Sequence, residues 1–376
     1  MANVNAVVTN LALTRAGSFS VSPALGAAIQ LTAGLVTHCA ITNCTASGAR
    51  IDPLFKVESG TADGVVVENN KVPTTITLYS ESLAPVVMVG GTLRNSVIRG
   101  NTFSDRAYGG ALCISGPALA EDCEISGNTS IKTEYSDYCT GGVSVRGGGV
   151  LRRCRIFNNT RSAAGAIYRS VGGVNTFGGN ATVDSCIITN NAAGVGKATS
   201  PVAGGVYVAA NATFINCLIA NNRQTDTTST TRSGGVHLEG GRLVNCTIAA
   251  NTSTMATNGG IYQVSGTVTN CIAWGNGGNV AGVFEQHDIK KTGGSVGYSC
   301  FGETVAGDGN ILADPVFRAD PPWRLKALSP CVGAGILLDG MRGSRDLAGN
   351  PRVIGSAVDL GCYEMDTPPA TFIMLR

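Results

Sequence analysis

The chain repeats one short unit at nearly constant spacing. The unit is a cysteine, an aliphatic residue two positions later and an asparagine five positions later. Six copies are clear, and they begin at Cys123, Cys154, Cys186, Cys217, Cys246 and Cys271. Subtraction of these numbers gives intervals of 31, 32, 31, 29 and 25 residues. A period in this range is typical of a solenoid, in which each repeat forms one turn and stacks on the next.

Weaker copies extend the repeat in both directions. Units with Cys39, Val65 or Ser96 in the first place fit upstream, and Ala6 begins an earlier candidate. Cys300 follows Cys271 by 29 residues and fits as the last copy. The sequence therefore predicts roughly eleven coils over residues 1–300, followed by an irregular capping segment over residues 301–376.

The periodicity within each repeat is that of strands. Apolar residues alternate, as in Cys186 and Ile188, and no long amphipathic helix is present. A second signal, Gly-Gly or Gly-Ala before a short apolar run, recurs at residues 109–110, 141–142, 165–166, 204–205, 234–235 and 259–260. Each coil then holds at least two short strands with room for a third. This pattern predicts an all-β fold, a right-handed single-stranded parallel β-helix.

Stacked turns assign a structural role to each repeated residue. The six cysteines and their aliphatic partners are expected to point inward and to stack on their copies about 4.8 Å away. Asparagines tolerate a left-handed backbone, and their side-chain amides can hydrogen-bond to the asparagine of the next turn. Asn128, Asn159, Asn191 and Asn222 are therefore expected to form a hydrogen-bonded ladder. The paired glycines are expected at turns with positive φ. Glu124 and Arg155 occupy the same outward position in successive coils. Opposite charges at such a position stabilise a parallel stack.

Composition excludes several classes of function. The 376 residues carry a net charge of +2 and only 14% charged residues, so no nucleic-acid partner is predicted. No apolar stretch is long enough to span a membrane. Most of the 13 cysteines occupy the ladder position, which favours buried thiols over a disulfide scaffold. With only three histidines and no Cys-x-x-Cys pair, neither a metal site nor a cofactor is predicted.

The last part of the chain has a different, ordered series of motifs. Asp314-Pro315-Val316-Phe317 and Ser329-Pro330 precede Asp346-Leu347-Ala348-Gly349-Asn350-Pro351-Arg352 and Asp359-Leu360-Gly361-Cys362-Tyr363-Glu364. The series resembles the choice-of-anchor-type C-terminal segment of bacterial secreted β-helix proteins. The repeats resemble those of polymorphic outer-membrane proteins. These resemblances imply an extracellular or cell-surface protein whose signal and anchor are not present in this chain.

Two cysteines depart from the pattern of that closing segment. Cys331 and Cys362 occupy places that are usually small or aliphatic in the family. We expect them to pair as a disulfide that pins the segment. A cap is needed on physical grounds in any case, because the end of a solenoid exposes unpaired strands and an open core.

Many β-helices degrade polysaccharides, and such enzymes need recognisable clusters of catalytic residues. Lyases of the pectate type need clustered carboxylates for Ca²⁺ and a nearby base, and hydrolases need paired carboxylates. Neither pattern is present, and no catalytic residue is predicted. Asp122, Arg153 and Asp184 are expected to align across three turns, where a structural ion ladder is the favoured interpretation.

An outward aromatic stripe is the candidate binding site. The residue after each glycine-led apolar unit is Tyr168, Tyr207, His237, Tyr262 and, after Gly282-Val283, Phe284. At one ring per turn the stripe would match an extended sugar chain, with Glu239 as a polar contact. The alternative is that the stacked rings only stabilise the sheet.

These observations favour a noncatalytic structural or adhesion protein of the cell surface or matrix, with a polysaccharide or host glycan as partner. Two alternatives remain open. One is a polysaccharide lyase or glycoside hydrolase of the pectate-lyase-like superfamily. The other is a fibre subunit that self-associates through its ends, since residues 1–35 contain no clear amphipathic cap.

Overall fold

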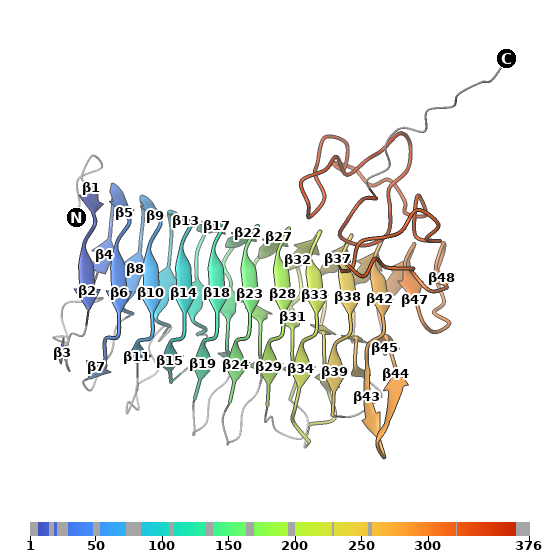
Figure 1. The fold of residues 1–376 in the computed structure, drawn as a ribbon, viewed down its shortest axis with the longest axis horizontal. Helices are drawn as coiled ribbons and strands as arrows, with labels where there is room; N and C mark the ends of the chain where they lie inside the picture. The colour runs from blue at the N-terminus through green and yellow to red at the C-terminus, as the bar shows by residue number, and fades with distance from the viewer. Residues whose placement is uncertain are drawn as a thin grey trace.

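The protein is an elongated right-handed parallel β-solenoid (Figure 1). The computed structural model describes residues 7–14, 19–20, 29–47, 53–72, 84–104, 109–131, 138–162, 169–194, 200–227, 229–254, 258–320 and 322–365. Each turn passes through four sheets that run the length of the molecule, which we call sheets 1 to 4 in chain order. The predicted fold class is therefore confirmed.

Sheets 1 and 2 form two adjoining walls of the solenoid. Sheet 1 contains β1 (Val7–Thr9), β5 (Leu35–Thr37), β9 (Thr61–Asp63), β13 (Thr92–Arg94), β17 (Leu119–Glu121), β22 (Val150–Arg152), β27 (Thr182–Asp184), β32 (Thr213–Ile215), β37 (Arg242–Val244), β41 (Thr267–Thr269) and β46 (Ser295–Gly297). Sheet 2 contains β2 (Ala12–Thr14), β6 (Ala40–Thr42), β10 (Val66–Glu68), β14 (Val97–Arg99), β18 (Glu124–Ser126), β23 (Arg155–Phe157), β28 (Ile187–Thr189), β33 (Leu218–Ala220), β38 (Thr247–Ala249), β42 (Ile272–Trp274), β47 (Cys300–Phe301) and β48 (Ile311–Leu312).

Sheets 3 and 4 complete the turn. Sheet 3 contains β11 (Lys71–Val72), β15 (Thr102–Phe103), β19 (Thr129–Ser130), β24 (Thr160–Arg161), β29 (Ala192–Ala193), β34 (Arg223–Gln224), β39 (Thr252–Ser253), β43 (Gly277–Val280) and β44 (Val283–Gln286). Sheet 4 contains β4 (Ile29–Leu31), β8 (Phe55–Val57), β12 (Val86–Met88), β16 (Leu112–Ile114), β21 (Val143–Val145), β26 (Val174–Thr176), β31 (Val206–Val208), β36 (Val236–Leu238), β40 (Ile261–Gln263) and β45 (Ile289–Lys291).

Two smaller sheets lie in the connections between the principal ones. One contains β20 (Cys139–Thr140), β25 (Ser170–Val171), β30 (Val202–Ala203) and β35 (Arg232–Ser233), and the other pairs β3 (Phe19–Ser20) with β7 (Ala46–Ser47). Eight turns, from β9–β12 to β41–β45, contribute a strand to all four principal sheets. The expected number of roughly eleven coils was too high, because the turns at both ends are incomplete.

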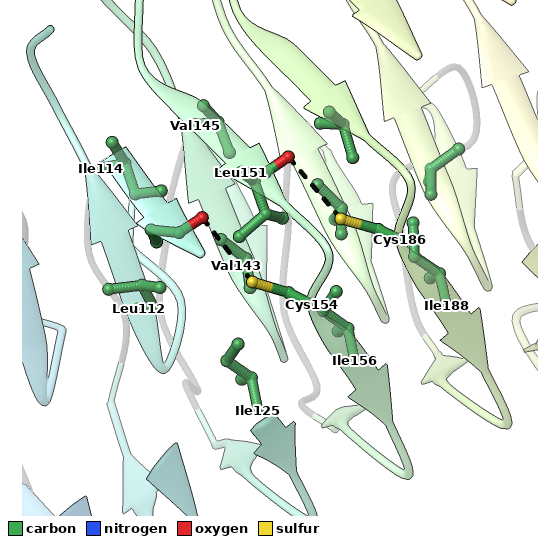
Figure 2. Packing of buried hydrophobic residues seen from close by; sticks show 14 of the residues in the cluster. Leu112, Ile114, Ile125, Val143, Val145, Leu151, Cys154, Ile156, Cys186 and Ile188 are labelled. Atoms are coloured by element: carbon green, nitrogen blue, oxygen red, sulfur yellow. Dashed lines mark hydrogen bonds between the residues drawn. The ribbon is translucent and has the colours of Figure 1, made fainter. Parts of the chain in front are cut away.

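The cysteine ladder lies inside the solenoid, as predicted. Each ladder cysteine is buried at the corner between sheets 1 and 2, and Figure 2 shows Cys154 and Cys186 pointing into the core beside Leu151 and Ile156. The Cys154 thiol donates to the carbonyl of Arg152 at 3.2 Å, and the Cys186 thiol donates to that of Leu151 at 3.6 Å. The Arg152 carbonyl also accepts from the Asp122 amide at 3.1 Å, so the thiol is a second, weak donor to it.

The asparagine ladder is longer than predicted. In each turn the side-chain amide donates to the Oδ1 of the next asparagine, at 3.0 Å from Asn159 to Asn191 and again from Asn191 to Asn222. The full series is Asn70, Asn101, Asn128, Asn159, Asn191, Asn222, Asn251 and Asn276. Asp288 ends it by accepting from Asn276 at 2.9 Å. A carboxylate suits that place because a terminal member has no further asparagine to which it must donate.

Two local expectations were wrong. The ladder asparagines do not adopt the left-handed backbone; the residue before each one does, with φ of 56° at both Asn158 and Asn190. The paired glycines do not have positive φ either. They are required by close approach between turns, because a Cβ on Gly173 would lie 2.6 Å from the carbonyl oxygen of Gly205.

The C-terminal end of the solenoid is closed by residues 302–312. Val305 packs against the end of the hydrophobic core, and β48 adds a short strand beyond β47. The Glu303 carboxylate accepts from the backbone amides of Asp288 at 2.7 Å and Ile289 at 2.9 Å. These contacts cover the strand edge that would otherwise remain open.

Residues 313–365 do not cover the end of the solenoid. They fold back along the outside of the solenoid, beside its last turns (Figure 1). We call this region the side segment. The expected capping role is thus carried by the ten or so residues before it, and the side segment covers outer faces of sheets 1 and 2.

Candidate functional site

The aromatic residues singled out from the sequence meet on the outer face of sheet 4. Tyr207, His237 and Tyr262 are the central residues of β31, β36 and β40, and they are neighbours in register. The Tyr207 and His237 rings are 5.0 Å apart and inclined by 7°. The His237 and Tyr262 rings are 5.3 Å apart and inclined by 19°. We call these three rings the aromatic column.

Cations lie over both ends of the column. The Arg169 guanidinium carbon is 3.4 Å from the centre of the Tyr207 ring, and Lys290 Nζ is 5.6 Å from that of Tyr262. The rings of Tyr207, His237 and Tyr262 are only 3%, 1% and 9% exposed. Their faces are therefore occupied by each other and by Arg169. A sugar ring has no open aromatic face to stack on, and the column instead ties successive turns together.

Two places of the predicted stripe are filled by other residues. Tyr168 lies outside the described residues, and Asn175 fills the place next to Tyr207 because Gly172-Gly173 is the glycine pair of that turn. The interpretation of Gly165-Ala166 as that pair was wrong. Phe284 lies in β44, which turns back antiparallel to β43, and Lys290 is the residue beside Tyr262. Gly282-Val283, in the hairpin, resembles the glycine-led unit but does not occupy its place in sheet 4.

His237 and Glu239 form the polar part of the site. His237 Nε2 lies 3.0 Å from Glu239 Oε2, and the Glu239 side chain is 45% exposed. Burial lowers the pKa of His237, and the hydrogen bond with His237 lowers the pKa of Glu239. The pair is thus a neutral imidazole that donates from Nε2 to a carboxylate. His237 Nδ1 is then a bare acceptor, and it has no hydrogen-bond partner in the described part of the chain.

Several outward charges form ion pairs between turns. Arg153 Nη2 lies 2.7 Å from Asp122 Oδ2 and 2.7 Å from Glu121 Oε2. Asp184 does not join this group as predicted; it is in register with Arg152, and its Oδ2 lies 3.4 Å from Arg152 Nε. The alignment was wrong by one residue. The hydrogen bond from Arg153 also lowers the pKa of Asp122, which keeps that carboxyl ionised and unsuited to donate a proton.

Other charged pairs repeat this arrangement nearer the N-terminus. Arg94 contacts Asp63 at 2.9 Å and Arg99 contacts Glu68 at 2.8 Å, each across one turn. The predicted pair of Glu124 and Arg155 is present at 4.0 Å. Among the described residues no group of three His, Cys, Asp or Glu side chains is placed to hold a metal ion.

The docking of the side segment was missed from the sequence. Outward residues of sheet 2 change from Glu124 and Arg155 to Ile187, Leu218 and, two turns later, Ile272. Leu218 packs with Cys362, Trp323 and Leu347 of the side segment, while Ile272 packs with Cys331, Leu325 and Leu360. The change from charged to apolar outward residues was the signal, since an apolar outer face needs a cover.

Hydrogen bonds fix the side segment on this face. Asn270 Nδ2 donates to the Ile336 carbonyl at 2.8 Å, and the Ile336 amide donates back to Asn270 Oδ1 at 2.9 Å. The Cys362 amide donates to Thr247 Oγ1 at 3.0 Å. Cys331 and Cys362 are free thiols in separate apolar clusters, so the predicted disulfide between them is not formed.

The motif residues of the side segment form its polar interior. Arg352 Nη2 donates to the carbonyls of Asp359 at 2.7 Å and Gly361 at 2.8 Å, and its Nε lies 3.1 Å from Glu364 Oε1. Asp346 accepts from the amides of Asn350 and Glu364, at 2.7 and 2.9 Å. Burial raises the pKa of Glu364 to about 7. The ordered motifs are thereby explained as the side-chain framework of a segment that has few strands.

Comparison with known families agrees with the fold. A family model described as "Right handed beta helix region" matches residues 27–201. No curated protein matches the chain. No helix among the described residues is long and apolar enough to cross a membrane.

Proposed function

We propose that the protein is a noncatalytic extracellular or cell-surface β-helix that acts as a structural or adhesion protein. The observation that supports this is the use of outward side chains for contacts between turns. Arg153, Asp122 and Asp184 are held in ion pairs, and the rings of the aromatic column stack on one another. A long array stiffened in this way suits a spacer or a display surface.

The resemblance of the motifs supports the location. The closing segment from Asp314 to Glu364 resembles the choice-of-anchor type, and the repeats resemble those of polymorphic outer-membrane proteins. In this proposal residues 1–300 are the repeat body and residues 301–376 are the closing segment. Secretion by the producing cell and recovery in its surface fraction would be the expected distribution; recovery with the cytosol alone would refute it.

We assign glycan contact to the polar rim of the aromatic column rather than to its ring faces. Glu239, which contacts His237, and Lys290, which lies over Tyr262, are exposed, and both present groups that hydrogen-bond to hydroxyls. The test is retention of the protein on immobilised neutral and acidic polysaccharides. Glu239→Gln combined with Lys290→Gln should reduce retention while the protein remains folded, and unchanged retention would refute this assignment.

Self-association through the N-terminal end is the second candidate. β1 and β2 are the outermost strands of sheets 1 and 2, and Val7 and Leu11 are exposed apolar residues there. Exposed edge strands pair readily with another chain. Sedimentation should show assemblies that grow with concentration and that Val7→Lys diminishes; monomers alone at every concentration would exclude this function.

A further inference from the structure

Cys300 differs from the other cysteines of the repeat. It is in register with Ile272, an outward residue of sheet 2. Ser299 fills the ladder position instead, because its Oγ accepts from the Cys271 amide at 3.0 Å and donates to the Gly297 carbonyl at 3.0 Å. The expectation that Cys300 continues the cysteine ladder was therefore wrong. Its thiol points outward, toward the side segment.

Cys331 is the residue of the side segment that meets it. The two cysteines belong to one buried cluster with Ile272, Leu325 and Leu360, and both are fully buried. Both are free thiols in this structure; the Cys300 thiol donates to the Ala313 carbonyl of the side segment at 3.1 Å, and each of the two cysteines shifts the pKa of the other, as close neighbours do. The Cys331 backbone is fixed on both sides, since its amide donates to Ser329 Oγ at 3.1 Å and its carbonyl accepts from the Leu360 amide at 3.0 Å. The pair is thus held in contact by elements that are themselves well anchored.

We propose that Cys300 and Cys331 form a disulfide bond that fastens the side segment to the last turn of the solenoid. The reaction is thiol–disulfide exchange with a low-molecular-weight disulfide such as oxidised glutathione. Two S–H bonds break and one S–S bond forms in the protein. The two electrons reduce the S–S bond of the oxidant, whose two sulfurs take up the two protons as thiols.

The geometry sets the order of events. The oxidant cannot reach either thiol once the side segment has docked, because both are fully buried. Oxidation therefore precedes docking or follows its transient release, and docking then protects the bond from reductants.

The bond closes a loop that contains the whole connection between the two regions. A cross-link of this kind acts mainly by restricting the unfolded chain. Its physiological occurrence rests on the proposed extracellular location, where disulfides persist. The pairing itself does not, so it can be tested on the purified full-length chain.

The experiment is oxidative refolding in a glutathione redox buffer. Folded protein is collected by gel filtration, free thiols are alkylated, and the digest is analysed by mass spectrometry without reduction. We expect one cross-linked peptide pair joining Cys300 to Cys331, lighter than the reduced pair by about 2 Da. The ladder cysteines and Cys362 should be alkylated after denaturation.

Variants provide the controls. Cys331→Ser should abolish the link, and Cys362→Ser, a change at another buried cysteine of the side segment, should leave it intact. Natively folded protein kept in the same buffer with a little urea, which releases the side segment, provides a second route to the bond. Either of two results, in folded protein from either route, would overturn the proposal. One is alkylation of both Cys300 and Cys331, and the other is a bond between Cys331 and Cys362.

Discussion

Replacement of Asn191 by alanine tests the asparagine ladder directly. The Asn191 side chain accepts from the amide and the Nδ2 of Asn159, both at 3.0 Å. It donates to the Ile156 carbonyl at 2.9 Å and to Asn222 Oδ1 at 3.0 Å. All four bonds are buried, and alanine makes none of them.

The magnitude follows from what the substitution leaves behind. A buried hydrogen bond contributes about 1 kcal/mol net, and a buried group left without a partner costs about 1–3 kcal/mol. The Asn159 amide and side chain lose their acceptor, while the Ile156 carbonyl loses one donor. Compact unfolded chains already shield some of these groups from water, which reduces the cost of leaving them unpaired in the folded state. We therefore expect the free energy of unfolding to fall by about 4 kcal/mol in total.

The assay is chemical denaturation followed by circular dichroism, with Asn180→Ala as the matched control. Asn180 is exposed in the same turn, and its replacement should change the free energy of unfolding by about 0.5 kcal/mol or less. A loss below about 1 kcal/mol for Asn191→Ala would refute the reasoning, because the ladder would then contribute no more than one ordinary hydrogen bond.

Three further substitutions test other parts of the structure by the same denaturation assay. Gly173→Ala should destabilise by about 1–3 kcal/mol through overpacking between turns, whereas Gly178→Ala, where a Cβ meets nothing within 4 Å, should be neutral; equal effects would contradict the close-approach explanation. Leu360→Ala should cost about 2–4 kcal/mol because the side chain is buried between the side segment and the solenoid; the exposed Leu328→Ala should cost almost nothing, and a similar cost for both would show that the segment is not docked. Burial raises the pKa of Glu364 to about 7, so the stability it contributes is complete below about pH 4.5 and is lost as the pH rises through 7; Glu364→Gln should flatten this dependence, and an unchanged pH profile would contradict it.

The fold was predictable because the same residue types recur along the sequence at nearly fixed spacing. Cys154, Ile156 and Asn159 recur with the same offsets in neighbouring turns, and each of these positions has one environment in the solenoid. Inward packing and amide pairing follow from those offsets alone. The register of charged pairs such as Glu124 with Arg155 followed in the same way.

Errors arose where a connection contains a copy of the repeated pattern. Gly165-Ala166 before β26 and Gly282-Val283 in the hairpin of β43 and β44 resemble the glycine-led unit, which misplaced Tyr168 and Phe284. The occupied faces of Tyr207 and His237 could not be read from their positions, because the covering group, Arg169, comes from another part of the turn. The residue pattern within the strands does not reveal which side chains from the connections cover those strands.

The side segment was recognised by its motifs but not by its position. Asp346, Arg352 and Glu364 form contacts within the segment, and such contacts carry no information about the surface on which it docks. That information lay in the solenoid, where Ile187 and Leu218 replace charged outward residues. Matching an unexplained apolar face with an unplaced segment would have predicted the contact.

The most direct test of the account is incubation of the purified protein with a panel of acidic and neutral polysaccharides, with the products analysed by mass spectrometry. The account predicts intact polymers across the panel, whether or not the protein is retained on them, because its outward ionisable groups hold the turns together. Shortened or unsaturated products that disappear in the His237→Ala variant would contradict it and would identify the pair of His237 and Glu239 as a catalytic centre.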